Sequence, residues 1–157
     1  MENIYFYETI VGPLGINDDG KNIVEILFSK EEVAKDLELK ETPLIKATME
    51  QLEEYFQGKR KDFDIPMEAR GTEFQKSVWN QLLKVPYGET CSYGEIAKRI
   101  GNPKASRAIG MANNRNPISI IIPCHRVIGA SGKLVGYGGG LDIKEKLLKL
   151  EKENLNL

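Results

Sequence analysis

The stretch SYGEIAKRIGNPKASRAIGMANN, residues 92–114, decides the expected fold of the second half of this chain. Ser92 and Glu95 stand three residues apart as in a capping box, which pairs side chains and backbone N–H groups at a helix start. Gly101 ends this helix, NPK turns the chain, and a second helix is expected to reach about Asn114. A helix, a tight turn and a helix at this spacing predict a helix-turn-helix.

The second of these helices carries short side chains, with Arg107 as the one long side chain among them. A helix that reads base edges in the major groove normally carries several Arg, Gln or Asn side chains. Short side chains instead permit close approach to a backbone or a narrow groove, where one arginine can insert at the place a base has left. The alternative, a helix packed tightly against a neighbour with Arg107 in solvent, stays open. The short residues are Ala105, Ser106, Ala108, Gly110 and Ala112.

Another capping box, Thr72 with Gln75, predicts a helix ahead of the helix-turn-helix. In that helix Phe74, Val78 and Leu82 recur at helical spacing and are expected to share one face.

After the helix-turn-helix, the isoleucines at residues 118–122 predict a buried strand. Pro123 cannot donate to a strand ladder, so the strand is expected to end at Cys124. A glycine-rich loop over residues 132–140 follows, and a last helix is expected to start at Asp142.

The first half of the chain predicts strands followed by a helix. Residues 4–10 and 22–29 have the composition of strands, and the NDDGK segment at 17–21 is a hairpin turn signal. Thr42 followed by proline is expected to open a helix that extends to about Gln57. The KRKDFDIPMEAR segment that follows has the mixed charge and proline of a linker.

Charge also divides the chain, whose net charge is −1. Residues 1–70 carry 9 Lys and Arg against 16 Asp and Glu, whereas residues 71–157 carry 13 against 7. We therefore expect an N-terminal α/β domain with a linker over 1–70 and a basic C-terminal domain over 71–157 that meets phosphate. An uneven scatter of charges without functional meaning is the alternative.

Several classes of protein are excluded by composition. No apolar run approaches the roughly eighteen residues that span a bilayer, and MENIYFYETI lacks the features of a signal peptide. Two cysteines and one histidine are too few for a disulfide framework or a usual zinc site. A cytoplasmic protein with free thiols is expected, with Cys91 as a buried packing residue.

The stretch IIPCHRVIG, residues 121–129, holds the only histidine, His125, directly after Cys124. Cysteine attacks as a thiolate, so a reactive one needs a group that lowers its pKa or takes its proton. Neighbouring side chains of a strand point to opposite faces, so the pair can cooperate only if the chain turns there. Glu151 stands near the end of the last helix, where a carboxylate opposes the helix dipole, and is a candidate to orient His125. A buried cysteine beside a hydrogen-bonded imidazole, without chemistry, is the alternative.

PCHRV, residues 123–127, resembles the active-site motif of the O6-alkylguanine-DNA alkyltransferases, the methylated-DNA–protein-cysteine methyltransferases. The similarity extends through SYGEIA, GNPKASRAIG, the Asn116–Pro117 pair and GYGGGLDIKEKLLKLE. It covers nearly all of residues 71–157 and is weaker over 1–70. The resemblance implies an α+β fold, in which a small ribonuclease H-like domain precedes a mainly helical domain of the winged helix-turn-helix type.

The resemblance also implies a reaction. A monomer would bind duplex DNA through the minor groove, flip out O6-alkylguanine or O4-alkylthymine, and transfer the alkyl group irreversibly to Cys124, once per molecule and without cofactor or metal. His125, through a water and held by Glu151, would form the thiolate, and Tyr93 would rotate the nucleotide and donate toward N3. The implied DNA contacts are Arg107, which fills the vacated stack, and Ala105, Ser106, Ala108 and Asn113. Asn116 would be the hinge residue, Tyr137 would form a wall of the pocket, and Lys144 would lie near its rim. The other residues implied for the pocket are Pro123, Val127 and Gly138.

Two departures and two rivals accompany this interpretation. Gly138 stands where some members have serine, and the chain lacks the Cys and His of the N-terminal zinc site found in several members. Non-catalytic relatives carry tryptophan at the nucleophile position, where this chain has Cys124. The first rival is a non-catalytic sensor of alkylated DNA or a helix-turn-helix regulator. The second is a cysteine hydrolase, for which the sequence has no obvious oxyanion-hole signature.

Overall fold

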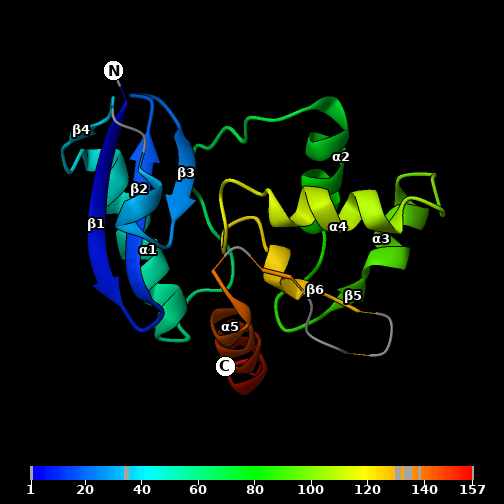
Figure 1. The fold of residues 1–157 in the computed structure, drawn as a ribbon. Coiled ribbons are helices and arrows are strands. Elements are labelled where there is room, and N and C mark those ends of the chain that lie inside the picture. The colour runs from blue at the N-terminus through cyan, green and yellow to red at the C-terminus, as the bar shows by residue number, and fades with distance from the viewer. Residues whose placement is uncertain (1, 34–35, 130–131, 133–135, 138, 157) are drawn as a thin grey trace. The chain divides into compact units, whose positions relative to one another are not determined.

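A computed structural model describes residues 2–33, 36–129, 132, 136–137 and 139–156 of the chain (Figure 1). These residues separate into two compact units, with the boundary between Arg70 and Gly71. The first unit is a small sheet with one long helix, and the second is mainly helical. The α+β architecture predicted from the sequence is therefore confirmed. Within the described ranges, no helix has the length and apolar character needed to cross a membrane.

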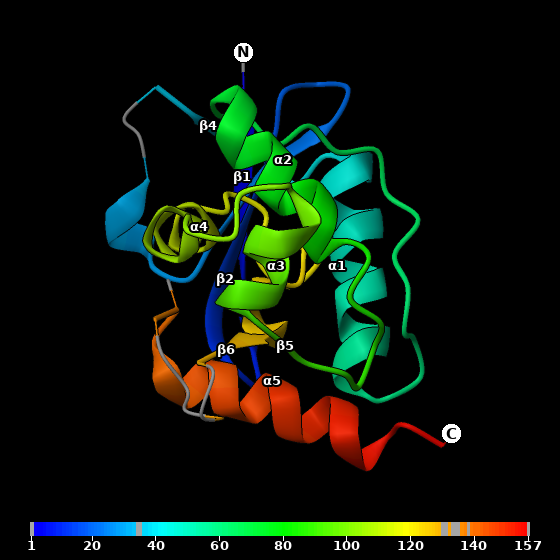
Figure 2. The ribbon, with the colours of Figure 1, turned by 90° about the vertical axis from the view of Figure 1, so that its right-hand side faces the viewer.

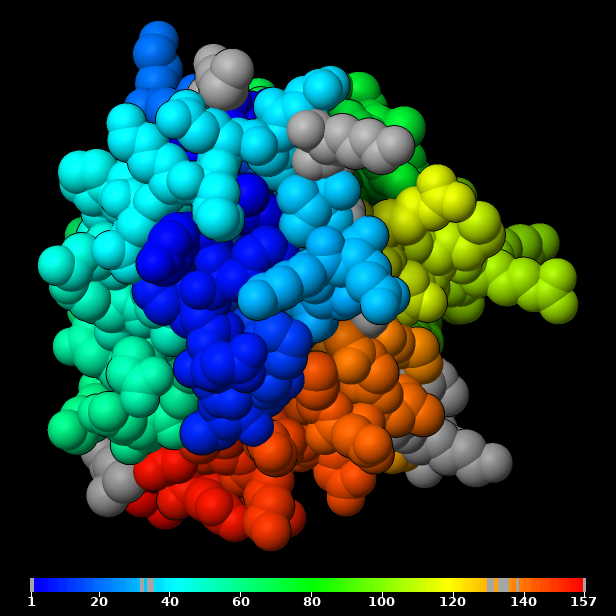
Figure 3. All heavy atoms as spheres, turned by 60° about the vertical axis from the view of Figure 1, so that its left-hand side comes forward, coloured from blue at the N-terminus to red at the C-terminus, as the bar shows by residue number. Residues whose placement is uncertain are grey.

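Four strands form the sheet of the first unit, in the order β3-β2-β1-β4. β1 and β2 make an antiparallel hairpin, β3 adds antiparallel to β2, and β4 runs parallel to β1. β2 and β3 are largely buried, whereas the side chains of β1 are mostly half-buried and reach the surface as the dark blue atoms of Figure 3. The strands are β1 (Asn3–Thr9), β2 (Gly12–Asp18), β3 (Ile23–Leu27) and β4 (Glu38–Leu39), with the 3₁₀ helix η1 (Lys30–Glu32) before β4.

Helix α1 (Pro43–Phe56) packs against β1 and β2. The hydroxyl of Thr42 accepts a hydrogen bond from the N–H of Ile45 at 3.1 Å, so the predicted cap is confirmed. Gly58, with φ of +75°, follows the end of the helix in the left-handed region where glycine is favoured. The helix buries one face, formed by Ile45, Thr48, Met49, Leu52, Tyr55 and Phe56.

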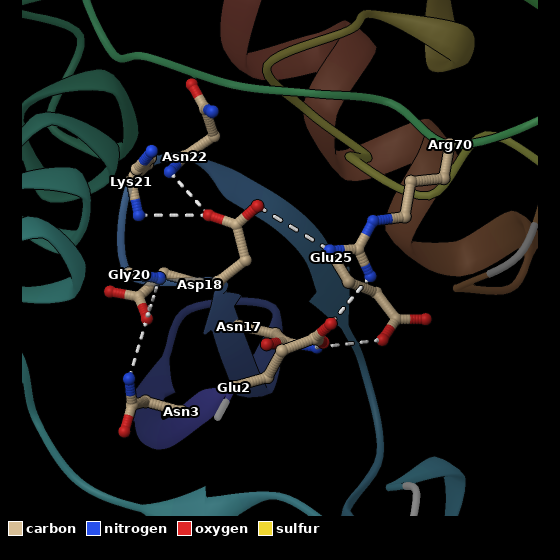
Figure 4. A network of polar contacts seen from close by, with 10 residues as sticks. Glu2, Asn3, Asn17, Asp18, Gly20, Lys21, Asn22, Glu25 and Arg70 are labelled. Carbon is tan, nitrogen blue, oxygen red and sulfur yellow. Dashed lines mark hydrogen bonds and ion pairs between the residues drawn. The ribbon is translucent and has the colours of Figure 1, made fainter.

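The turn between β2 and β3 carries a network of polar contacts (Figure 4). The carboxylate of Asp19 accepts hydrogen bonds from two backbone N–H groups of the turn, at 2.8 and 2.9 Å. Asp18, which is 1% exposed, accepts from the Asn3 amide at 3.0 Å and from the Thr42 hydroxyl. The same loop therefore fixes the start of β1 and the start of α1.

Residues 59–70, expected to be a linker, return to the edge of this sheet. The N–H of Ile23 donates to the carbonyl of Pro66 at 2.9 Å, and its carbonyl accepts from Glu68 at 2.9 Å. Arg70 then forms an ion pair with Glu2 at 2.7 Å (Figure 4). The linker prediction is wrong for the last part of the segment, because a pattern of proline and mixed charge carries no information about these backbone partners.

The second unit is built from helices around a short parallel strand pair. α2, α3 and α4 pack on one another, and β5 pairs with β6 so that Cys91 lies beside Val127. Figure 2 shows α5 running below the β5–β6 pair. The elements are α2 (Glu73–Leu82), β5 (Cys91–Ser92), α3 (Tyr93–Arg99), α4 (Ser106–Asn114), the 3₁₀ helix η2 (Cys124–Arg126), β6 (Val127–Ile128) and α5 (Leu141–Glu153).

Both predicted capping boxes in this unit are confirmed, at the starts of α2 and α3. The predicted face of α2 is only partly correct. Val78 and Leu82 are 0% exposed, but Phe74 is 37% exposed and its place on the buried face belongs to Trp79. α5 begins one residue earlier than expected, at Leu141.

The isoleucine run is a tight turn, so the prediction of a buried strand is wrong. The N–H of Ile122 donates to the carbonyl of Ile118 at 3.0 Å, and Ile120 lies in the left-handed region with φ of +75°. This conformation costs a β-branched residue on the order of 1–3 kcal/mol. Asn116 closes the turn from both ends, since its amide donates to the carbonyl of Ile122 at 2.7 Å and accepts from the N–H of Ile118 at 3.0 Å. Burial of the four isoleucines offsets the strain.

We expect Trp79→Phe to destabilise the packing of α2 on α4. The indole N–H of Trp79 donates to the carbonyl of Ala112 at 2.9 Å in a buried position. Its loss leaves that carbonyl without this donor, at a cost of about 1–3 kcal/mol, in addition to the lost volume. Urea unfolding followed by circular dichroism measures this cost. Leu83→Ala, at a position 46% exposed, is the control and should change stability by less than about 0.5 kcal/mol. Equal stability of wild type and Trp79→Phe would contradict this account of the packing.

Candidate active site

The thiol of Cys124 is buried at the first position of η2, directly after the isoleucine turn. Burial raises the pKa of Cys124, against the opposing hydrogen bonds from the side chains of Asn116 and Ser119 and the positive charge of Lys144. The raised pKa keeps the thiol protonated at neutral pH in the resting protein. A reaction at this sulfur therefore needs a group that accepts its proton.

His125 follows on the same 3₁₀ turn and is 0% exposed. Its Nε2 lies 2.6 Å from Oε2 of Glu151. Burial lowers the pKa of His125 and the charges of Arg126 and Lys144 lower it further, which outweighs the opposing effect of Glu151. The imidazole is therefore neutral at pH 7, with its proton on Nε2 toward the carboxylate. Any proton that leaves the thiol for His125 must then go to Nδ1.

The carboxylate of Glu151 is 0% exposed and is held from several sides. Oε1 accepts from the backbone N–H of Gly88 at 3.1 Å and from Nε of Arg126 at 2.8 Å. Oε2 accepts from Nη2 of Arg126 at 3.1 Å as well as from His125. Burial alone would raise the pKa of Glu151, but the hydrogen bonds and charges of His125 and Arg126 outweigh it and hold the pKa at about 2. A carboxylate that opposes the helix dipole is thus stabilised by tertiary partners.

Arg126 is a site residue that the sequence reasoning missed. Its guanidinium is buried, pairs with Glu151, donates from Nη1 to the carbonyl of Val85 at 2.7 Å and lies 5.6 Å from the centre of the Tyr87 ring. It ties the turn before β5 to η2 and α5. The signal available in the sequence was the position of this arginine inside PCHRV, directly after a run of apolar residues. If the chain is buried there, the charge of the arginine needs a partner of opposite charge.

Lys144 is fully buried on α5, in contrast to the expected place near a pocket rim. Its Nζ donates to the carbonyl of Val127 at 2.6 Å and to that of Gly136 at 3.3 Å. Burial lowers the pKa of Lys144, while the interaction with Cys124 raises it. The long stem lets a residue of an amphipathic helix reach the interior, which residue type alone did not indicate.

Tyr93 and Asn113 connect the helix-turn-helix to the site. Tyr93 opens α3 and interacts with the side chain of Asn113; burial raises the pKa of the Tyr93 phenol, and Cys124 raises it further. Asn113 is 1% exposed and donates from its amide to the carbonyl of Cys124 at 3.2 Å. Asn113 was expected among the DNA contacts, and its burial inside the protein corrects that expectation. On α4 it belongs to the buried residues, together with Ile109 and Ala112.

Of the other residues expected to line the pocket, Tyr137 is half-buried, and Val127 and Pro123 are buried. Burial raises the pKa of the Tyr137 hydroxyl well above its ordinary value, with a further rise from Cys124 and an opposing hydrogen bond from Ser119. Val127 is 0% exposed, and Pro123 is buried before Cys124. Gly138 lies outside the described residues.

The exposed face of α4 carries Arg107, Met111 and two of the short residues of the helix-turn-helix. Ser106, Arg107 and Ala108 are exposed and Ala105 is half-buried, whereas Ile109 and Ala112 turn inward. Two of the short side chains therefore face solvent instead of packing against a neighbour. This arrangement favours the interpretation in which the helix approaches another surface closely.

These features define a class, a helix-turn-helix protein with a buried cysteine next to an imidazole that a buried carboxylate holds. Comparisons with known proteins identify the family. Residues 4–69 match the description "6-O-methylguanine DNA methyltransferase, ribonuclease-like domain", and residues 73–153 match "6-O-methylguanine DNA methyltransferase, DNA binding domain". The chain belongs to the 6-O-methylguanine DNA methyltransferase family, which confirms the resemblance inferred from PCHRV.

Individual relatives agree with this assignment. The methylated-DNA–protein-cysteine methyltransferase of Methanosarcina acetivorans is 55% identical over 148 residues, which cover 92% of this chain and 95% of the relative. The crystal structure of Mycobacterium tuberculosis O6-methylguanine methyltransferase matches with a TM-score of 0.91 at 44% identity, over 98% of this chain and 94% of that one. The crystal structure of Mycobacterium tuberculosis OGT in complex with DNA matches with a TM-score of 0.91 at 45% identity, over 97% and 94% of the two chains.

Replacement of Glu151 by Gln tests the ionised carboxylate through the pH dependence of stability. A carboxylate with a pKa of about 2 when folded and an ordinary value of 4.5 stabilises the fold above about pH 5, and this contribution is lost as the pH falls toward 2. We expect Glu151→Gln to cost on the order of 3 kcal/mol at pH 7, because the charge of Arg126 loses its partner, and the cost to shrink below pH 4.5.

Urea unfolding at pH 7, 5, 4 and 3, followed by circular dichroism, measures this difference. Glu153→Gln on the same helix is the matched control, since that side chain is 61% exposed and 3.9 Å from Lys149. Its effect should be below about 1 kcal/mol. A cost of Glu151→Gln that does not change with pH would contradict the assignment of a buried, ionised carboxylate.

Proposed function

We propose that this protein repairs duplex DNA by transferring the alkyl group of O6-alkylguanine to Sγ of its own Cys124. The observation that carries the proposal is the buried Cys124 on one 3₁₀ turn with His125, whose far nitrogen is held by Glu151 at 2.6 Å. Its support from comparison is the 55% identity to a methylated-DNA–protein-cysteine methyltransferase.

The reaction balances with the groups of this site. The thiol proton passes to Nδ1 of His125, through a water, and the thiolate attacks the alkyl carbon. The S–C bond forms as the C–O6 bond breaks, and the electron pair of that bond goes to guanine. The leaving guanine takes up one proton, which balances the proton that the thiol gave to His125. Tyr93, whose phenol lies close enough to Cys124 to interact with it, assists by donating a hydrogen bond toward N3.

Lys144 contributes by electrostatics. Its ammonium is fully buried and interacts with Cys124. At the moment when the thiol loses its proton, this fixed positive charge stabilises the thiolate in a region of low dielectric. Since the carbonyls of Val127 and Gly136 hold Nζ in place, little reorganisation accompanies the reaction.

DNA is the partner that the family and the DNA complex of the Mycobacterium tuberculosis relative support. In our proposal a monomer lays the exposed face of α4 into the minor groove, and Arg107 fills the stack that the flipped nucleotide leaves. The short side chains Ser106 and Ala108 permit the close approach. O4-alkylthymine is a second substrate in this proposal, and the cytoplasm is the proposed location.

Each molecule reacts once in this scheme. The product is a thioether, which water does not cleave under physiological conditions and which has no acidic proton left to exchange with His125. The rival function, a sensor of alkylated DNA without chemistry, requires binding but no nucleophile. The surroundings of Cys124 favour transfer, because a buried lysine and two hydrogen-bonding side chains stabilise a charge that a pure binder does not generate.

The direct test incubates the protein with duplex oligonucleotide containing O6-methylguanine. We expect a gain of one methyl group, about 14 Da, on the peptide that contains Cys124, and one equivalent of DNA repaired per protein however long the incubation. Peptide mass spectrometry and chromatography of the DNA bases measure both. Repaired DNA beside an unmodified Cys124 peptide would disprove the nucleophile. Cys124→Ser is the matched control and should keep salt-sensitive DNA binding while losing transfer.

Arg107→Ala should slow methyl transfer from duplex DNA while leaving transfer from free O6-methylguanine base nearly unchanged. The reason is that the arginine acts only on the stacked duplex, where an unfilled gap costs a few kcal/mol. Single-turnover rates on duplex and on free base measure the two effects. Arg99→Ala removes an equal charge from the exposed end of α3 and is the control. An equal slowing on both substrates, or an equal effect of both variants, would contradict the role given to Arg107.

A further inference from the structure

A groove lies between the first turn of α2 and the exposed side of α4, two helices that pack on one another within the second unit (Figure 1). Its volume is about 200 Å³, which is below the roughly 300 Å³ at which small-molecule pockets begin. A groove of this size, open along a helix, suits a segment of a larger partner better than an enclosed small ligand.

The floor of the groove is apolar and partly open to solvent. Met111 is 61% exposed and Phe74 is 37% exposed, although both are large apolar side chains. The methyl groups of Ala108 and Ala112 complete the floor. Apolar side chains that are exposed together on one surface, with polar groups around them, are typical of an interaction site.

Arg115 is the one charged side chain among the described residues that line the groove. It is exposed at the C-cap of α4, and its guanidinium forms no hydrogen bond or ion pair with the described part of the chain. The polar lining residues Thr72 and Gln75 hold each other in the capping box of α2. A cation at the end of an apolar floor suits a partner in which an anion is joined to an apolar group. An interaction of Arg115 with the helix dipole, without any partner, is the alternative.

The groove continues the face of α4 that is proposed to enter the minor groove of DNA. Arg107, Met111 and Arg115 follow one another at intervals of four residues, so they lie along one side of the helix. At 1.5 Å per residue, Arg107 and Arg115 are about 12 Å apart along the helix axis. The minor groove of B-DNA is only about 6 Å wide. A helix that crosses it with Arg107 inside therefore reaches the bordering backbone with Arg115.

We propose that the groove binds the sugar–phosphate backbone of one DNA strand, with the guanidinium of Arg115 on a phosphate and the side chain of Met111 against a deoxyribose. This inference rests on the proposed function and adds a second contact surface to the α4 face. Deoxyribose complements the apolar floor, and phosphate complements Arg115 and the basic balance of residues 71–157, which carry 13 Lys and Arg against 7 Asp and Glu. Such a contact fixes the protein on the duplex without reading its sequence.

The experiment measures binding to a duplex without alkylated bases by fluorescence anisotropy, between about 50 and 200 mM salt. One phosphate contact contributes about 0.9 to the slope of log affinity against log salt concentration. We expect Arg115→Ala to lower this slope by about 0.9, and to weaken binding about fifteenfold at 50 mM salt and about fourfold at 200 mM. Arg115→Lys keeps the charge and should retain the wild-type slope.

Lys149→Ala is the matched control, because it removes one charge from a side chain of α5 that is 75% exposed. It should change the slope by less than about 0.2 and the affinity by less than about twofold. If Arg115 acts only on the helix dipole, Arg115→Ala lowers the midpoint of urea unfolding and leaves the salt slope unchanged. An unchanged slope, or an equal change in Lys149→Ala, would overturn the proposal.

Met111→Glu tests the floor of the groove. Its carboxylate would face the phosphate backbone, so binding at 50 mM salt should weaken at least about tenfold, whereas the neutral Met111→Gln should weaken it by less than about threefold. Both variants should fold, because Met111 is 61% exposed. Equal binding by the two variants would mean that no phosphate lies beside Met111. A wild-type dimer that sedimentation detects without DNA and that Met111→Glu dissociates would assign the groove to a second copy of this chain. Either result contradicts the proposal.

Binding to the unmodified duplex is independent of alkyl transfer. If the variants bind as expected but no methyl group reaches Cys124, the proposed function fails and the assignment of the groove stands. If methyl transfer succeeds and Arg115→Ala keeps the wild-type slope, the assignment of the groove fails alone. A wild-type protein that binds no duplex at any of these salt concentrations overturns both.

Discussion

The Glu151 carboxylate, buried near the end of α5, accepts hydrogen bonds from η2 through His125 and Arg126 and from the turn before β5 through Gly88. Three segments far apart in the sequence are thereby fixed around one charge. Without Arg126 this charge would be buried next to a neutral imidazole, which is unfavourable. Without Glu151, Nε2 of His125 would lose the acceptor that sets its tautomer. The arrangement of the nucleophile, the base and the helix-turn-helix behind them depends on this one group.

Charge compensation also explains how the site can hold a thiolate only when it is needed. In the resting protein Glu151 is paired with Arg126, His125 is neutral and the thiol of Cys124 is protonated. In the proposed reaction, transfer of the proton to His125 creates an imidazolium next to Glu151 and a thiolate near Lys144. Each new charge therefore appears beside an existing charge of opposite sign. Formation of the thioether removes the negative charge at sulfur and leaves Lys144 with its carbonyl partners, Val127 and Gly136.

Much of the fold could be predicted because its signals are local. The Thr72–Gln75 and Ser92–Glu95 capping boxes require only four consecutive residues, and both occur as predicted. The isoleucine run failed because apolar β-branched residues favour strands only where the backbone is free to extend. Here the side chain of Asn116 forms hydrogen bonds with both ends of the segment. The spacing of apolar residues in the sequence cannot reveal such a contact.

The site was harder to predict from residues alone. Adjacent Cys124 and His125 left open a buried pair without chemistry, and their assignment as a reactive pair came from the resemblance of PCHRV to a known motif. The partner of Arg126 lies 25 residues away on another helix, so its pairing is invisible without the fold. The burial of Lys144 and Asn113 likewise follows from how α5 and α4 pack, since both residue types are ordinarily exposed.

In the proposed mechanism His125 rests as a neutral base whose Nε2 proton is held by Glu151. His125 is the only histidine in the chain, so nitrogen-15 NMR of uniformly labelled protein reports its ring without ambiguity. We predict a neutral imidazole at pH 7, with the proton on Nε2 and a pKa below the ordinary 6.5. An imidazolium at pH 7, or a neutral ring with its proton on Nδ1, would contradict it.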